Sequence, residues 1–331
     1  MTDTRFYEAL GPVAAETLAA GLPIQGHAAL PVGSVAAFGA AEADGLSYLE
    51  GRLKGEPPPL KGCVVASASA APALLAAGAG AVIVAESPRA AFARMLPHLF
   101  RQRLWTDEGP APLVEAGARV SPQAILSPGC AIGAGAVIAP LAVIGPGCAI
   151  GRNTIIGPHV SLQCALIGDG VTIGAGSVIG ERGFGVAGDR GGLVDLPHLG
   201  RVILQDRVSI GAGTTIERGM LDDTVVGEDS KIDNLCQIAH NVRLGRRVVV
   251  AAFGGISGST VIEDGARLGG RVGIADHRHI GENAQLAAGS AVMHDVPANE
   301  TWGGYPAQPV RAWMRETAWL RRMQRKGDGG Q

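Results

Sequence analysis

The chain has 331 residues, enough for two or more structural units. Its formal net charge is only −2, so there is no global electrostatic case for binding nucleic acid. Glycine contributes 50 residues and aromatic residues only 4%, a composition that suits tight coils with small corner residues. The five cysteines are odd in number and form no CxxC pair, which indicates a reducing cytoplasm rather than a disulfide framework.

Residues 1–105 show no long-range repeat and are predicted to form a small α/β domain. Expected elements are strands at 34–38, 63–66 and 81–85, and helices at 6–20, 70–77 and 89–100. The uncharged stretch 62–85 is rich in Ala, Gly and Ser and contains Pro72, so strand–helix–strand is favoured over a membrane span. The first eight residues include acids and no apolar core, unlike a secretory signal.

An aliphatic residue recurs at every sixth position from Val226 to Val292 without a miss. Neither a helix nor an ordinary strand has this period. A hexapeptide period is the signature of a parallel β-helix, in which three short strands make one triangular coil. We therefore predict a mainly β fold, a left-handed parallel β-helix. The position two places before the aliphatic residue is mostly small, and three of the cysteines occupy it as expected small core residues: Cys130, Cys148 and Cys236.

The ladder begins earlier and is interrupted. The step of six holds from Val120 to Leu162, slips by one before Ile167, and stops over 180–200 before it resumes at Ile210. We interpret the slip as a tightened corner. We interpret the gap, rich in Gly and Asp, as a loop projecting from one corner, a position that often carries binding in solenoids.

Composition divides the chain into four parts: an α/β domain at 1–105, a linker at 106–117, the β-helix at 118–297 and a C-terminal helical extension at 298–331. One helix is expected over 308–326. Its apolar stripe cannot be buried by the helix alone, so the helix must cap the open β-helix end or pack on copies of itself. The stripe consists of Val310, Trp313, Met314, Thr317, Leu320 and Met323.

Residues eighteen apart stand in one column of a hexapeptide β-helix, on successive coils. His240, Gly258 and Asp276, with His277 beside it, are therefore expected along one edge within about 10 Å, two coil spacings. Acyl transfer needs a base to take a proton from the nucleophile and an N–H to stabilise the oxyanion. We predict His240 as that base and the Gly258 amide as that donor.

Two other interpretations of these histidines stay open. Solenoid corners often carry polar residues, and eight histidines in 331 residues are not unusual. Trimeric hexapeptide proteins also bind zinc through histidines shared between subunits, for which His240, His277 and His279 are candidates. Spacing alone does not separate these possibilities.

Two long strings around this column resemble a known family. Residues 214–224 (TTIERGMLDDT) and 232–242 (IDNLCQIAHNV) are similar to the UDP-3-O-(3-hydroxyacyl)glucosamine N-acyltransferases of lipid A synthesis. Residues 183–187 (GFGVA) resemble the start of that family's loop in the sugar region, and 303–309 (GGYPAQP) its exit from the β-helix. Hexapeptide acyltransferases in general share the period but not these strings.

The resemblance implies transfer of a 3-hydroxyacyl chain from acyl carrier protein to the 2-amine of UDP-3-O-acylglucosamine, with no cofactor and no metal. It implies a homotrimer in the cytoplasm of a Gram-negative bacterium, not membrane-spanning, with sites in clefts between subunits. His240 matches the general base, Gly258 the oxyanion-hole amide and His277 a second, supporting histidine. Substrate-binding neighbours are matched by Asp233, Asn234 and Gln237, and Asp233 is a candidate to orient His240.

The sequence departs from the family pattern at two places. The family shows an aromatic residue followed three positions later by Asn, both holding uracil, whereas here Tyr48 is followed by Gly51. Tyr48 can still stack on the base, so residues 1–105 are expected to bind the nucleotide with one polar contact fewer. An Asp commonly precedes the Gly-Phe pair of the family's loop, and here Arg182 takes its place, which puts the mode of sugar or acyl-chain binding in question.

The expected C-terminal helix carries six cations against one acid, Glu316. These charges either solvate a packing helix or form a docking face for acyl carrier protein, an acidic partner as a family trait. Opposite charges speed encounter and fix orientation. The cations are Arg311, Arg315, Arg321, Arg322, Arg325 and Lys326, of which Arg311, Arg315, Arg322 and Arg325 are the predicted docking residues.

Three other functions are considered. An acyl- or acetyltransferase acting on a different nucleotide sugar needs the same base, and only assays with amine and hydroxyl acceptors separate it. A metal-dependent hydratase on a β-helix is disfavoured by the added N-terminal domain and the basic C-terminal helix. A non-catalytic structural β-helix is not expected to need His240 beside Gly258.

Overall fold

The computed structural model describes residues 2–327, which form two compact units. The α/β unit and the solenoid unit are both discontinuous in sequence, because segments of the former interrupt the latter. The α/β unit comprises Met1–Asp107, Arg182–Gly200 and Met220–Asp222, and the solenoid unit comprises Glu108–Glu181, Arg201–Gly219 and Asp223–Gln331.

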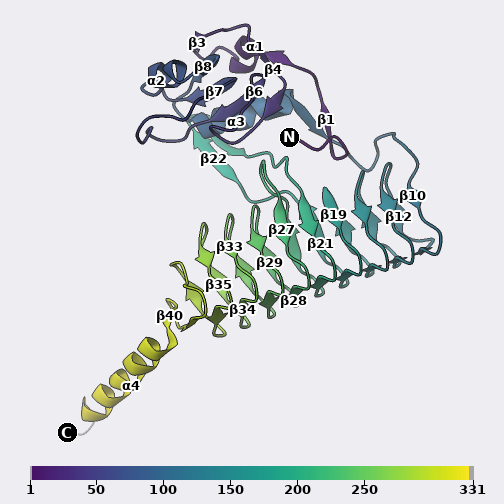
Figure 1. Cartoon of the computed structure of the whole chain (residues 1–331), viewed down its shortest axis with the longest axis vertical. Coiled ribbons are helices and arrows are strands. Elements are labelled where there is room, and N and C mark those ends of the chain that lie inside the picture. The colour runs from purple at the N-terminus through teal and green to yellow at the C-terminus, as the bar shows by residue number, and fades with distance from the viewer. Residues whose placement is uncertain (1, 328–331) are drawn as a thin grey trace. The chain divides into compact units, whose positions relative to one another are not determined.

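The solenoid unit is a parallel β-helix in which each coil gives one strand to each of three sheets (Figure 1). Strands of neighbouring coils pair in parallel, mostly at a register of eighteen residues, as in Gln237 with Gly255. The predicted fold class, a mainly β left-handed parallel β-helix, is confirmed.

The first sheet contains β10 (Leu113–Val114), β13 (Ala131–Ile132), β16 (Ala149–Ile150), β19 (Ala165–Ile167), β24 (Val202–Leu204), β27 (Thr224–Val226), β30 (Arg243–Leu244), β33 (Val261–Ile262) and β36 (His279–Ile280). The second contains β11 (Arg119–Val120), β14 (Val137–Ile138), β17 (Ile155–Ile156), β20 (Thr172–Ile173), β25 (Ser209–Ile210), β28 (Lys231–Ile232), β31 (Val249–Val250), β34 (Arg267–Leu268), β37 (Gln285–Leu286), β39 (Thr301–Gly303) and β40 (Gln308–Pro309). The third contains β12 (Ile125–Leu126), β15 (Val143–Ile144), β18 (Ser161–Leu162), β21 (Val178–Glu181), β26 (Thr215–Glu217), β29 (Gln237–Ile238), β32 (Gly255–Ile256), β35 (Gly273–Ile274) and β38 (Ala291–Val292).

The aliphatic ladder forms the solenoid core. In a typical strand the first residue points outward and the second inward, so Ile155 is exposed while Ile156 is fully buried. The small position just before the strand is buried in most coils, and Cys130, Cys148 and Cys236 fill it as predicted. The solenoid begins with β10, inside the segment 106–117 predicted as a linker.

Both irregularities of the ladder have a structural cause. The one-residue slip is confirmed as a tightened corner, because β19 pairs Leu166 with Ala149 after the left-handed residue Cys164. The gap over 180–200 is not a loop on a solenoid corner but a β-hairpin of the α/β unit, β22 (Val186–Asp189) and β23 (Gly192–Asp195).

The hairpin is part of the α/β unit because it packs against a helix there, α3 (Pro88–Met95). Ala187 and Leu196 share a buried cluster with Ala90 and Ala93. Arg94 forms a two-bond ion pair with Asp189, and the hydroxyl of Ser87 donates to the carbonyl of Gly188 at 3.0 Å. These apolar and polar contacts attach the hairpin to α3, whereas a solvated loop would lack them.

The α/β unit is built on a five-stranded sheet of order β3-β8-β7-β6-β5, with β5 to β8 parallel. Its strands β7 and β8 and helix α2 lie where they are predicted, whereas β6 is an additional buried strand. The elements are β1 (Tyr7–Ala9), β2 (Val13–Ala14), α1 (Ala15–Ala19), β3 (Ile24–Gly26), β4 (Pro31–Val32), β5 (Ser34–Val35), β6 (Gly45–Tyr48), β7 (Cys63–Ala66), α2 (Ala71–Ala76), β8 (Ala81–Val84), α3, a 3₁₀ turn (Leu96–His98) and β9 (Phe100–Gln102).

Two predicted helices of this unit are corrected. The helix expected over 6–20 is instead β1, β2 and the short α1, because Gly11 has a left-handed φ of 96° and Pro12 follows it. The helix expected over 89–100 ends at Met95 and gives way to a 3₁₀ turn that contains Pro97.

The C-terminal helix α4 (Val310–Gly327) follows β40 at the end of the solenoid unit, close to its predicted bounds (Figure 1). Trp313 packs at the helix start, where it lies against Gly304. Further along, Met314 and Leu320 are 59% and 61% exposed, so the apolar stripe does not cap the coils. None of the described helices is long and apolar enough to cross a membrane.

Adjacent residues of β17 test the inward and outward alternation. Ile156→Ala should lower the free energy of unfolding by about 2–5 kcal/mol, because it empties a fully buried site. Ile155→Ala removes the same atoms from an outward-facing side chain and should cost much less. Urea unfolding of both variants measures the difference, and equal losses would contradict the assigned faces.

Candidate functional site

The candidate site lies at the corner of the solenoid that follows the third sheet. We call it the histidine corner and define it as the turns 239–242, 257–260 and 275–278, after β29, β32 and β35. The register places His240, Gly258 and Asp276 in one column, with His277 in the adjoining column. The coils are joined there by backbone bonds, because the His277 N–H donates to the Gly258 carbonyl at 3.0 Å.

The imidazole of His240 lies directly against Gly258. A Cβ added at Gly258 would stand 2.7 Å from His240 Cε1 and 2.8 Å from Nε2, closer than real Cβ contacts allow. Gly258 is not among the glycines with positive φ, so its backbone would accept another residue. Glycine is needed at this position for space rather than for conformation.

Gly258 combines burial with a backbone N–H that has no acceptor within the described chain. The equivalent N–H groups of Ala252 and Asp276 also donate to nothing within residues 2–327, but those two residues are less buried. At other corners, the residue two positions after the buried aliphatic residue often donates its N–H to a carboxylate of the next coil. Arg246, which follows Leu244 in this way, donates to Asp264 at 2.8 Å. Gly258 is buried, yet within residues 2–327 its N–H donates no hydrogen bond. Buried N–H groups without a partner are rare, so this donor is suited to a bound oxyanion.

The next residue in sequence, Asn241, contacts the imidazole of His240. Nδ1 lies 3.1 Å from Oδ1 of Asn241. An amide oxygen only accepts, so this contact is a hydrogen bond in the neutral tautomer that carries its hydrogen on Nδ1 and a lone pair on Nε2. That is the tautomer a general base requires.

Within the described chain the contact to His240 Nδ1 comes from Asn241 and not from Asp233, the candidate from the sequence. Asp233 belongs to a different corner, where its carboxylate accepts the N–H of Asn234 at 2.7 Å, and within the described chain it makes no bond to His240. The side chain of Asn234 accepts the N–H of Ala212 at 2.6 Å. The sequence signal for Asn241 is its position directly after the histidine.

The other predicted residues of the solenoid differ in their hydrogen-bond partners. Gln237, on β29, donates to Glu217 at 2.9 Å, and Glu217 is a site neighbour that sequence analysis missed. His277 is exposed and its side chain makes no hydrogen bond within residues 2–327. His279 lies in the first sheet, where its Nε2 is 3.0 Å from Glu263.

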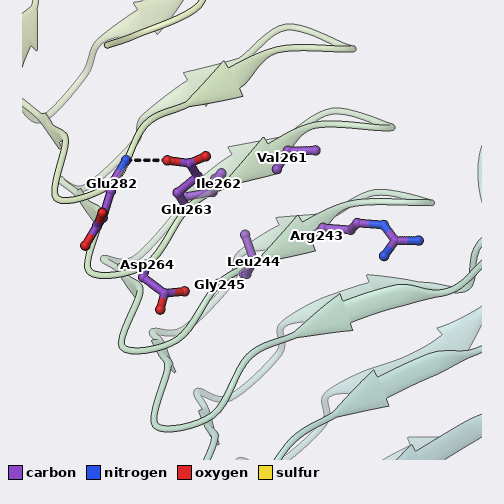
Figure 2. A pocket seen from close by; sticks show the side chains of 8 residues that line it. All are labelled: Arg243, Leu244, Gly245, Val261, Ile262, Glu263, Asp264 and Glu282. Carbon is purple, nitrogen blue, oxygen red and sulfur yellow. Dashed lines mark hydrogen bonds between the residues drawn. The ribbon is translucent and has the colours of Figure 1, made fainter. Parts of the chain in front are cut away.

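A separate open hollow of about 490 Å³ lies on the first sheet and its following corner. Figure 2 shows its lining, including Arg243, Val261, Glu263 and Glu282, with the Glu282 N–H bonded to Glu263 at 2.9 Å. None of the histidine-corner residues lines it. In the part of the chain that the structure describes, no three His, Cys, Asp or Glu side chains are grouped to hold a metal ion.

In the α/β unit, Tyr48 ends β6 at the carboxyl edge of the parallel strands, where ligands of such sheets bind. Its ring is tilted against Phe92, with centroids 4.8 Å apart. Burial raises the pKa of the Tyr48 phenol, an effect that the charge of Arg89 opposes. Gly51 has a left-handed φ of 75° and open space around it.

Arg182, the second departure from the family pattern, also belongs to the α/β unit. Its guanidinium is paired with Asp195 at 2.7 Å, so it closes the base of the hairpin. The neighbouring Phe184 is 83% exposed.

On α4, Arg311, Arg315 and Arg322 are exposed, and within the described residues none of them joins an ion pair. The acid Glu316 accepts instead from Gln308 at 2.6 Å. The side chain of Arg325 lies outside the described residues.

The comparisons with known proteins agree with this architecture. The family model "bacterial transferase hexapeptide (six repeats)" matches residues 129–164 and 223–258. The UDP-3-O-acylglucosamine N-acyltransferase of Caulobacter sp. (strain K31) is 58% identical over 158 residues, 48% of this chain and 46% of that protein. That of Methylorubrum extorquens (strain PA1) is 52% identical over 167 residues, 50% of this chain and 48% of that protein.

The chain is similar to UDP-3-O-acylglucosamine N-acyltransferases. The resemblance predicted from the two sequence strings is thereby confirmed. The similarity spans about half the length of these curated relatives. Among solved structures, the UDP-N-acetylglucosamine acyltransferase of Francisella novicida has 25% identity and a TM-score of 0.49, over 60% of this chain and 69% of that one.

A methyl group at Gly258 tests the packing of the histidine corner. Gly258→Ala should push the His240 ring off its present position, because the added carbon would lie within 2.8 Å of the ring. Gly255→Ala is the matched control, since a Cβ there meets nothing within 4 Å. Crystal structures of the two variants make the comparison, and an unmoved His240 ring in Gly258→Ala would contradict the contact.

Proposed function

We propose that this protein is an N-acyltransferase that moves a 3-hydroxyacyl chain from acyl carrier protein to the 2-amine of UDP-3-O-acylglucosamine, in lipid A biosynthesis. The observation that carries the proposal is the His240 imidazole packed on Gly258, a buried residue whose N–H donates no hydrogen bond within residues 2–327. The names of the relatives supply the reaction type and the substrate class.

The proposed chemistry follows from the two groups at the corner. His240 Nε2 takes a proton from the sugar amine as its nitrogen attacks the thioester carbonyl. The negative oxygen of the tetrahedral intermediate accepts the Gly258 N–H. Collapse breaks the carbon–sulfur bond, and the imidazolium returns the proton to the leaving thiol of the carrier. The amide product and the free thiol balance the reaction without metal or cofactor.

The remaining predicted residues take supporting parts in this proposal. Tyr48 stacks on the uracil, and the open space at Gly51 leaves the base with one contact fewer. Asp233, Asn234 and Gln237 are exposed polar groups available to the sugar, while His277 supports the reacting groups from the next coil.

Assembly and location are part of the same proposal. The exposed stripe on α4, with Met314 and Leu320 more than half exposed, favours a homotrimer in which these helices are covered. Five buried free cysteines fit the reducing cytoplasm.

The direct test is mass spectrometry of product from the purified protein. It is offered acyl carrier protein thioesters of several lengths, with a UDP-sugar that bears a 2-amine or one that bears a hydroxyl. Acylation of the amine supports the proposal. Acylation of only the hydroxyl, or of a different nucleotide sugar, identifies the alternative acyl- or acetyltransferase.

Removal of the proposed base tests the role of His240. His240→Ala should lower turnover by roughly 10²–10⁴-fold, the usual contribution of a positioned general base, with little change in UDP-sugar binding. His98→Ala, an exposed histidine of the α/β unit, is the control. Near-normal turnover of His240→Ala in steady-state assays would mean that another group is the base.

Charge reversal on α4 tests docking of the acidic carrier. Arg311→Glu with Arg315→Glu and Arg322→Glu should weaken use of the carrier-linked donor and leave a small thioester donor unaffected. Use of the carrier by the parent should also fall with salt, because the Debye length shrinks from about 10 Å at 0.1 M to about 3 Å at 1 M. Arg119→Glu, on β11, is the control for reversed charge.

Steady-state kinetics are measured for each variant with both donors. Light scattering gives the oligomeric state of each variant, which should remain a trimer. Equal loss with both donors would mean that α4 serves assembly and not docking.

A further inference from the structure

A regular backbone bond joins successive coils at the histidine corner, but in the described part of the chain it is missing between the turn of His240 and the coil before it. In this bond the third residue of each turn donates its N–H to the carbonyl of the second residue of the preceding turn. Ser259 donates to the His240 carbonyl in this way at 2.9 Å. The coil before His240 has no such corner turn. There the chain leaves the third sheet after Glu217 and begins its next strand only at Thr224.

One side chain replaces the missing backbone acceptor of Asn241, and a second accepts the N–H of His240. The N–H of His240 donates to Oε2 of Glu217 at 3.1 Å, and the N–H of Asn241 donates to Oγ1 of Thr224 at 2.8 Å. These two acceptors flank the excursion on either side. The turn that carries the base and its orienting amide is therefore held by residues at the departure and the return of the chain.

Both acceptors are themselves fixed. Thr224 is fully buried. Glu217 uses its other oxygen, Oε1, to accept from Gln237 at 2.9 Å, and Thr215 bonds to Gln237 in turn. The next residue, Arg218, is 4% exposed and donates to the Gly180 carbonyl at 2.9 Å, which anchors the departing chain.

We propose that Glu217 and Thr224 are positioning residues for the proposed reaction, which act by fixing the turn of His240 and Asn241. The inference rests on the proposed function for its kinetic consequence. Neither residue needs to touch the substrate. A base displaced by about 1 Å loses on the order of 10²-fold in rate, so two hydrogen bonds to its backbone are sufficient to matter.

The kinetic test uses pairs of variants that remove or keep the acceptor. Thr224→Val and Glu217→Ala should each lower kcat by about 10–100-fold with KM for the UDP-sugar unchanged, because geometry and not binding is lost. Thr224→Ser and Glu217→Gln keep an oxygen for the N–H and should retain most of the parent's kcat. The double variant Glu217→Ala, Thr224→Val should lose less than the product of the single losses.

A matched control separates positioning from general loss of a buried hydroxyl. Thr154 is also fully buried, and its Oγ1 accepts the N–H of Val171 at 3.0 Å on another coil. Thr154→Val makes the same chemical change away from the histidine corner. If it lowers kcat as much as Thr224→Val, the positioning role is overturned.

A structural readout keeps this inference distinct from the proposed function. Hydrogen–deuterium exchange of the peptide covering 237–243 should speed up in Thr224→Val and Glu217→Ala but not in Thr154→Val. Unchanged exchange in both variants overturns the inference even if His240→Ala is inactive. Faster exchange with unchanged kcat overturns it as well. If the parent transfers no acyl group, the proposed function fails while the exchange result still decides whether the two side chains hold the turn.

Discussion

The interaction on which the structure depends is the parallel backbone pairing that sets residue i of the solenoid over residue i+18. Buried aliphatic side chains stabilise the stack, each worth about 1.5–3 kcal/mol of burial, and the pairing repeats their position without drift. Once that register is fixed, every corner column is fixed with it. His240 and Gly258 meet for the same reason that Ile238 and Ile256 meet.

Chemistry arises where this regular register is varied in small ways. At the histidine corner the ladder continues, but one coil presents an imidazole and the next presents no side chain at all. The result is a close contact between His240 and Gly258 that a Cβ would abolish. The preceding coil is interrupted, so the N–H groups of His240 and Asn241 are held by the side chains of Glu217 and Thr224. The repeat thus places the residues of this corner in columns, and its interruption gives the turn of His240 contacts that the other described turns of the corner lack.

The sequence predicts the β-helix and the column of His240 and Gly258 well, because both depend only on counting along an exact period. It fails where the answer depends on the direction of a side chain or on contacts distant in sequence. The linear string offers Asp233 as a partner for His240, yet Asp233 lies at a different corner of the triangle, and the contact to His240 comes from Asn241. Glu217 precedes His240 by an irregular interval that spans an excursion, so no period points to it. A helix was expected over 6–20 from its apolar spacing, but Gly11 and Pro12 break the helical backbone there.

The discontinuous α/β unit has a consequence for the order of events during synthesis. Its buried cluster contains Ala90 and Ala93 from the first part of the chain and Ala187 and Leu196 from the hairpin. Met220, from the segment 220–222, packs against this cluster. A nascent chain that has emerged only through Asp107 therefore lacks part of its own interior. The solenoid coils between Glu108 and Glu181 reach the outside of the ribosome before the first unit is complete. Each coil contacts mainly its neighbours and is able to form in that interval, whereas the α/β unit can be completed only after the hairpin and Met220 have emerged.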